Sequence, residues 1–156
     1  LLAVTTADCV PILIGDVEGS VAAAIHAGWR GAVAGVVGAA VGAMEAQGAR
    51  RERLVAAIGP AIRQPSYEVD VPLRDAVLRA SPDAAHFLVA GGRADRFQFD
   101  LPGYCRHLLH AAGAKEVDDL GVDTLEQGHI YFSHRRSKQR NEGGYGLQMS
   151  GIVVPA

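Results

Sequence analysis

Two apolar runs separated by a short turn near the start of the chain limit its possible folds more than any other feature. The runs occupy residues 10–14 and 21–25, and the segment between them begins with the turn-like Gly-Asp-Val-Glu-Gly. Apolar runs of this length around Gly and Asp are typical of a β-hairpin. We expect the centre of the hairpin to fall between residues 17 and 18, so that the chain begins with paired antiparallel strands.

This pairing centre places Cys9 opposite His26. Directly opposed residues of an antiparallel pair have Cβ atoms about 5 Å apart on one face of the sheet. A thiolate and an imidazole at that separation can share a proton or bind a metal ion. Asp8 is either a turn residue or a polar partner that orients a metal ligand. We therefore take Cys9, His26 and Asp8 as candidate catalytic residues.

A zinc site needs more than these two ligands, because catalytic zinc usually takes three protein ligands and keeps a fourth position for water. The remaining histidines have no spacing that selects one of them as the third ligand, and each on its own is more typical of a structural role. They are His86, His107, His110, His129 and His134.

Length and composition favour one globular domain over residues 1–156, since the chain is 49% hydrophobic and long enough to bury a core. The formal net charge of −2 gives no basic excess for nucleic acid. The weakly polar run 32–44 is broken by glycines and is too short for a membrane span. Two cysteines make no disulfide framework, and no secretory leader is recognisable. We expect a cytoplasmic monomer or homodimer.

The remaining pattern alternates helices and strands. A strand at residues 1–6 precedes the hairpin, and Asp100 can cap a helix that carries Pro102 early. The order predicts an α/β or α+β sandwich with a mixed sheet. The predicted helices are 32–47 (stopped by Gly48), 71–80 and 101–112, and the predicted strands are 54–58, 97–99, 130–134 and 148–154.

Candidate anion contacts follow the hairpin. His26-Ala27-Gly28-Trp29-Arg30-Gly31 leads into a predicted helix, so free N–H groups and Arg30 suit a phosphate. The loop 59–69 offers Gln64, Tyr67 and Glu68 as polar contacts or is a plain connection. A local basic cluster is interpreted as a solvated loop, with an anion contact as the second interpretation. The cluster comprises Arg135, Arg136, Lys138 and Arg140.

The combination of these motifs resembles the YfiH-like family over essentially the whole chain. The motifs are TTADCVPILI followed by HAGWRG, then IGPAI, YEV, FDL, YFSHRR and GYGLQMSGIVV. The family is known as multicopper polyphenol oxidase or laccase and, more recently, as purine nucleoside phosphorylase with adenosine deaminase activity. Two positions differ from the family pattern: Leu147 stands where an Arg is frequent, and His134 stands where a Tyr is found.

The resemblance implies a mixed sheet flanked by helices, similar to the catalytic domain of the cytotoxic necrotizing toxins. It also implies a metal, zinc or possibly copper, on one cysteine and two histidines. Cys9 and His26 match the cysteine and the second histidine. The first histidine lies upstream in the family, which predicts that an N-terminal portion of the family domain is missing before Leu1. The implied partners are purine nucleosides and phosphate, with contacts from Gly28, Arg30, Gly31, Gln64, Tyr67 and Arg135.

The mechanism implied by the resemblance has metal-activated water attacking C6 of adenosine, and phosphate held near Arg30 attacking ribose C1′. A thiol hydrolase or deamidase with Cys9 as nucleophile and His26 as base is a second possibility. A copper oxidase ranks lower, because one Cys and one well-placed His fall short of a multicopper cluster. An inactive interaction protein is the remaining alternative.

Overall fold

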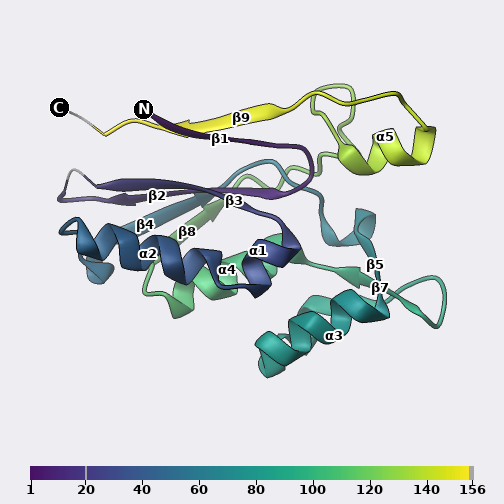
Figure 1. Cartoon of the computed structure of the whole chain (residues 1–156), viewed down its shortest axis with the longest axis horizontal. Helices are drawn as coiled ribbons and strands as arrows, with labels where there is room; N and C mark the ends of the chain where they lie inside the picture. The colour runs from purple at the N-terminus through teal and green to yellow at the C-terminus, as the bar shows by residue number, and fades with distance from the viewer. Residues whose placement is uncertain (20, 155–156) are drawn as a thin grey trace.

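The computed structural model describes residues 1–19 and 21–154, which form three layers (Figure 1). A four-stranded sheet of order β3-β2-β4-β8 lies between a two-stranded ribbon of β1 and β9 and a layer of helices. All strand pairs are antiparallel except β4 and β8. The fold confirms the predicted mixed β-sandwich flanked by helices. The strands are β1 Leu2–Thr6, β2 Val10–Asp16, β3 Ala22–Ala27, β4 Leu54–Ile58, β8 Glu116–Asp119 and β9 Gln148–Ile152.

The helices that cover the sheet are α1 (Trp29–Val33), α2 (Val36–Ala46) and α4 (Leu101–Ala111). The predicted single helix 32–47 is wrong at its start, because Gly35 adopts a left-handed φ of 86° that ends α1 and turns the chain into α2. Gly48 follows the C-cap of α2 with φ 94°, as its position after the helix predicts.

A smaller sheet of order β5-β7-β6 packs with α3 beside the main sheet. Asp70 caps α3 by accepting a hydrogen bond from the Leu73 N–H, and Asp100 caps α4 through the Gly103 N–H. The predicted helix 71–80 and the capping role of Asp100 are confirmed. The bounds are β5 Glu68–Asp70, α3 Val71–Ala80, β6 Leu88–Ala90 and β7 Arg96–Phe99, with short 3-10 turns at Arg51–Arg53, Gln64–Ser66 and Pro82–Phe87.

The core lies between the sheet and the helices. Val10, Ile12 and Ile14 alternate along β2 and are fully buried, since β2 is a central strand of the sheet. Each such side chain contributes about 1.5–3 kcal/mol when it is fully removed from water. The opposite face of β2 meets the ribbon: a Cβ atom at Gly15 would lie 3.8 Å from Cδ1 of Ile152.

The hairpin register corrects the predicted pairing of Cys9 with His26. Pro11 pairs with His26 and Gly15 with Ala22, so the centre lies one residue later than expected. The cause is Asp16, which extends β2 because it also pairs with Leu54 of β4. Continuing the register beyond Val10 puts Cys9 beside Gly28, with His26 diagonal to it on the same face.

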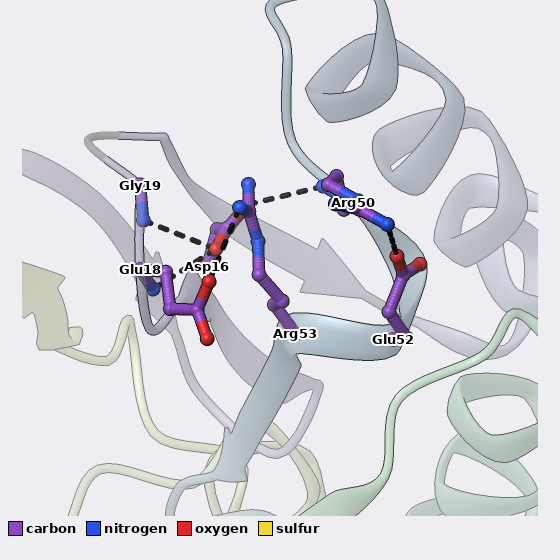
Figure 2. Close-up of polar contacts among 6 residues, drawn as sticks. All are labelled: Asp16, Glu18, Gly19, Arg50, Glu52 and Arg53. Carbon is purple, nitrogen blue, oxygen red and sulfur yellow. Dashed lines mark hydrogen bonds and ion pairs between the residues drawn. The ribbon is translucent and has the colours of Figure 1, made fainter.

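Asp16 fixes this turn with its buried carboxylate (Figure 2). One oxygen accepts from the N–H groups of Glu18 and Gly19, each at 3.1 Å. The other accepts from the Arg50 N–H at 3.0 Å and from the Arg53 guanidinium at 2.6 Å. The hydrogen bond from Arg53 lowers the pKa of Asp16 to about 2. The carboxylate therefore ties the hairpin to the segment that enters β4.

Two further expectations fail in the C-terminal third. The predicted strand 130–134 is a turn followed by α5 (His134–Arg140), because the Ser133 hydroxyl accepts the Arg136 N–H and starts a helix. The basic cluster read as a loop is therefore helical. Strand β8 was not predicted, because its sequence Glu-Val-Asp-Asp has no run of apolar residues. Such a charged sequence is typical of an exposed edge strand.

No helix within the described ranges is long and apolar enough to cross a membrane.

Candidate functional site

A cavity of about 480 Å³ opens beside the start of β2 and the end of β3. Five segments that are distant in sequence meet there: the loop before β2, the end of β3 with the start of α1, the loop 62–67, the start of α4 and the segment around α5. The lining residues are Ala7, Asp8, Cys9, His26, Trp29, Arg30, Ile62, Tyr67, Leu101, His134, Arg135, Lys138, Tyr145 and Leu147.

Cys9 lies half-buried in this cavity. Burial, and secondly the negative charge of Asp8, raise the pKa of the Cys9 thiol above its ordinary value of 9.0. The group is therefore a neutral thiol at neutral pH, and a thiolate would need a cation or metal beside it. A Cβ atom at Gly28 would lie 3.0 Å from Cys9 Sγ, so the glycine leaves room for the sulfur.

His26 comes from β3 and is exposed on the cavity wall. It is diagonal to Cys9 across the sheet end, and diagonal neighbours have Cα atoms about 7–8 Å apart. A small molecule, a water or an ion can fit between groups at that spacing. The structure thus brings Cys9 and His26 to one cavity, although not as a directly opposed pair.

Asp8 connects the Cys9 loop to two other parts of the chain. Its carboxylate accepts the Thr124 hydroxyl at 2.7 Å and the Arg135 N–H at 2.6 Å, and its carbonyl oxygen accepts the Ile62 N–H at 3.0 Å. Asp8 also holds a left-handed φ of 81°, which is unusual for a residue with a side chain. Both carboxylate oxygens of Asp8 already accept hydrogen bonds within the protein. The buried Asp8 therefore holds the Cys9 loop against Ile62, Thr124 and Arg135.

Arg135 and Tyr67 form one wall. The Arg135 guanidinium lies 5.4 Å from the Tyr67 ring centroid and donates two hydrogen bonds, both at 3.0 Å, to the Glu68 carbonyl oxygen. Burial is the main reason that the pKa of Tyr67 is raised to about 12. Its phenol is therefore a neutral hydrogen-bond donor at neutral pH. Arg30 stands nearby with its guanidinium 4.5 Å from the Trp29 ring centroid.

Some predicted contacts lie away from the cavity. Gln64 donates to the Phe87 carbonyl oxygen and so fixes its own loop. Gly31 and Gly28 are absent from the lining, although Gly28 shapes it through Cys9. Of the five further histidines, His134 alone lines the cavity, where its ring packs edge-on against Tyr145 at 4.9 Å.

Several lining residues carried no local signal in the sequence. Ile62, Leu101 and Tyr145 are apolar or aromatic side chains on three separate segments, and only the tertiary fold brings them together. Thr124, which donates to Asp8, likewise gave no indication of a role.

The cavity contains two groups that could bind a metal ion. Cys9 and His26 are suitable zinc ligands, but residues 1–19 and 21–154 contain no group of three or more His, Cys, Asp or Glu side chains that could hold an ion. Two ligands do not hold a catalytic zinc, and they fall further short of a multicopper cluster. The described residues therefore do not make a complete metal site.

A family model described as "Multi-copper polyphenol oxidoreductase laccase" matches residues 1–155. A purine nucleoside phosphorylase from Rickettsia conorii is 36% identical over 154 residues, which are 99% of this chain and 63% of that protein. The chain thus spans somewhat less than two thirds of the length of this relative.

Solved structures share the fold. A Neisseria meningitidis protein superposes with a TM-score of 0.88 at 33% identity, covering 99% of this chain and 60% of its own. The Bacillus licheniformis protein YfiH superposes with a TM-score of 0.84 at 28% identity, covering 96% of this chain and 57% of its own.

Proposed function

Since this chain belongs to the YfiH-like family, described by its family model as multi-copper polyphenol oxidoreductase laccase, we propose that it takes part in purine nucleoside phosphorolysis. The relatives named purine nucleoside phosphorylase support the reaction class. The observation that carries the proposal is the cavity in which two arginines face a thiol and an imidazole. Such a cavity offers both an anion contact and groups that can move a proton.

The proposed reaction replaces a C–N bond by a C–O bond. A phosphate oxygen forms a bond to C1′ of the ribose while the bond from C1′ to the purine nitrogen breaks. The bonding electron pair leaves with the base, which takes up a proton, and ribose 1-phosphate remains. Negative charge thus moves from the phosphate to the base, and groups that accommodate both ends lower the barrier.

The chain's own residues supply these groups in the proposal. Arg30 and Arg135 bind phosphate, because guanidinium groups match its geometry and charge. His26 moves the proton, since an imidazole is the side chain best suited to proton transfer near neutral pH. Cys9 and the Tyr67 phenol serve as neutral contacts to the nucleoside. Asp8 positions Cys9 and Arg135.

Adenosine deaminase activity is a further part of the proposal. It exchanges the C6 amino group for oxygen from water and releases ammonia, which requires an activated water. Zinc remains the proposed metal for Cys9 and His26, because thiolate and imidazole suit it, although the described residues bring no third ligand to this pair. The two cysteines, Cys9 and Cys105, are free thiols, which fits the proposed cytoplasmic location.

The thiol-hydrolase alternative has less support. A nucleophilic cysteine needs a lowered pKa, whereas burial and Asp8 raise the pKa of Cys9. His26 is also diagonal to Cys9 and not directly opposite it, because it pairs with Pro11.

The test is to incubate the protein with inosine, guanosine or adenosine, with and without phosphate, and to separate the products by chromatography. We expect free base and ribose 1-phosphate only when phosphate is present, and inosine from adenosine in either case. His26→Ala should abolish phosphorolysis, while His129→Ala, an exposed histidine outside the cavity, should not. Absence of free base from all three nucleosides would refute the proposed phosphorolysis.

A further inference from the structure

A second cavity of about 410 Å³ adjoins the first. It shares Trp29, Arg30, Tyr67 and Arg135 with the first cavity, so these residues form a common wall. Its own contribution includes Arg96, from the start of β7. Three guanidinium groups therefore face one small cavity, and Tyr67 stands between that cavity and the Cys9 side.

The Arg96 side chain has unused hydrogen-bonding capacity. Its Nε is buried and has no hydrogen-bond partner among the described residues. The nearest carboxylate belongs to the exposed Asp95, at 3.8 Å from Nε, which is too long for a hydrogen bond. A buried N–H without an acceptor is costly, unless a ligand or an ordered water supplies the acceptor.

The guanidinium groups of the two other arginines also form no ion pair with a carboxylate among the described residues. Arg135 donates to a neutral carbonyl oxygen, that of Glu68, so its positive charge is not cancelled by a carboxylate. The Arg30 guanidinium stacks on Trp29 and makes no hydrogen bond or ion pair within residues 1–19 and 21–154. An anion in the cavity can therefore meet three guanidinium groups that have N–H donors to spare.

Two acidic residues also line this cavity. The Asp70 carboxylate is engaged as the cap of α3, where it accepts the Leu73 N–H. Glu68 provides its backbone carbonyl to Arg135 and also carries a carboxylate. Against three arginines the formal balance is still positive by one charge, and the arginines provide the hydrogen-bond donors that an oxyanion needs.

We propose that this arginine cavity is the binding subsite for inorganic phosphate, with Arg96 as a phosphate contact. The inference rests on the proposed phosphorolysis and makes it more specific: the nucleoside occupies the Cys9 cavity and phosphate occupies the arginine cavity. The shared wall at Tyr67 and Arg135 is then where C1′ and the phosphate oxygen meet. Arginines hold phosphate through paired N–H donors, and three of them around one cavity favour a multiply charged oxyanion.

Phosphate binding to the purified chain tests this subsite directly, by titration calorimetry with inorganic phosphate as the probe. Arg96→Gln should weaken binding by roughly tenfold or more, because hydrogen bonds to charged groups each contribute that much. Arg93→Gln is the matched control, since Arg93 lies in the same β-hairpin and is largely exposed. We expect the control to bind as the unaltered protein does.

Steady-state kinetics provide the second measurement. Arg96→Gln should raise KM for phosphate and leave KM for the nucleoside unchanged. If phosphorolysis occurs but KM for phosphate is the same in both proteins, the subsite is wrong and the proposed function stands. If the chain binds phosphate in an Arg96-dependent way without phosphorolysis, the subsite stands and the function fails. No phosphate binding, or equal binding in both variants, overturns the subsite.

Discussion

The carboxylate of Asp8 accepts a hydrogen bond from the backbone N–H of Arg135, 127 positions later in the chain, at 2.6 Å. This contact joins the loop that carries Cys9 to the first turn of α5. The two sides of the cavity are therefore held at a fixed separation by a residue that does not itself need to touch a substrate. The strained φ of Asp8 is maintained by the contacts of its carboxylate and its carbonyl oxygen.

Asp8→Asn should destabilise the protein by about 1–3 kcal/mol, because the neutral amide has one acceptor oxygen where the carboxylate has two, and it lacks the charge that strengthens both hydrogen bonds. Urea unfolding followed by circular dichroism measures the change. Asp118→Asn on the exposed edge strand β8 is the control and should have little effect. Equal stability of the two variants would show that the Asp8 contacts do not hold the site together.

Acid should weaken the hairpin anchor at Asp16. Its pKa in the folded protein is about 2, below the usual value of 3.8, so the contribution of Asp16 to stability is complete above about pH 4. That contribution is lost as the pH falls towards 2. Asp16→Asn should be less stable at pH 6 and should show a shallower loss between pH 4 and 2, measured as Tm against pH. Glu18→Gln, at an exposed carboxylate of the same turn, should retain the steep profile.

Cys9 should react slowly with iodoacetamide at pH 7. Burial and Asp8 raise the pKa of its thiol above 9.0, so the rate should keep rising with pH beyond 9. Mass spectrometry of the alkylated protein should find the label on Cys9, since Cys105 is fully buried in the core. Rapid labelling with a midpoint near neutral pH would instead indicate a cation beside the sulfur and would revive the nucleophile interpretation.

Gly28→Ala should lower the rate of phosphorolysis, because the added methyl group would displace the Cys9 sulfur. The backbone of Gly28 has φ −73° and ψ 163°, which alanine adopts freely, so the new methyl group 3.0 Å from Sγ is the only disturbance. The control is Gly38→Ala in α2, where a Cβ meets nothing within 4 Å. That variant should be neutral or more stable by up to about 1 kcal/mol, because alanine favours a helix. Comparable activity in both variants would contradict a role for the Cys9 position.

Zinc retention should be incomplete. With Cys9 and His26 as the available ligands, dialysed protein should carry less than one equivalent by inductively coupled plasma mass spectrometry, and Cys9→Ser should carry less still. A full equivalent that withstands dialysis would mean that a third ligand reaches the cavity.

Much of the architecture follows from local chemistry. The strand 54–58 and the helix 71–80 have the predicted bounds, because apolar runs, proline and Asp caps act over a few residues. The register of the hairpin could not be predicted from local sequence. It depends on Asp16, whose carboxylate accepts hydrogen bonds from Arg50 and Arg53, more than thirty positions away. Strand β8 was missed because a charged edge strand has no apolar pattern to detect.

The candidate site also has residues that local sequence motifs predict and residues that depend on the tertiary fold. Cys9, His26, Arg30 and Tyr67 were predicted from motifs, and all four line the cavity. Arg96 was not found, because its relevance depends on where β7 pairs with β5 across the cavity. A single arginine at the start of a short strand resembles any solvated residue until the neighbouring cations are placed around it.

The pairing of β1 with β9 has a consequence for how the site is assembled. Leu2 lies opposite Ile152, so the ribbon closes a loop of nearly the whole chain, and such long-range contacts form late in folding. Tyr145 and Leu147 directly precede β9, so the cavity wall is completed only when the ribbon docks. During synthesis, a ribosome must therefore release the chain through β9 before the cavity wall is complete, and ligand binding reports that the ribbon has docked.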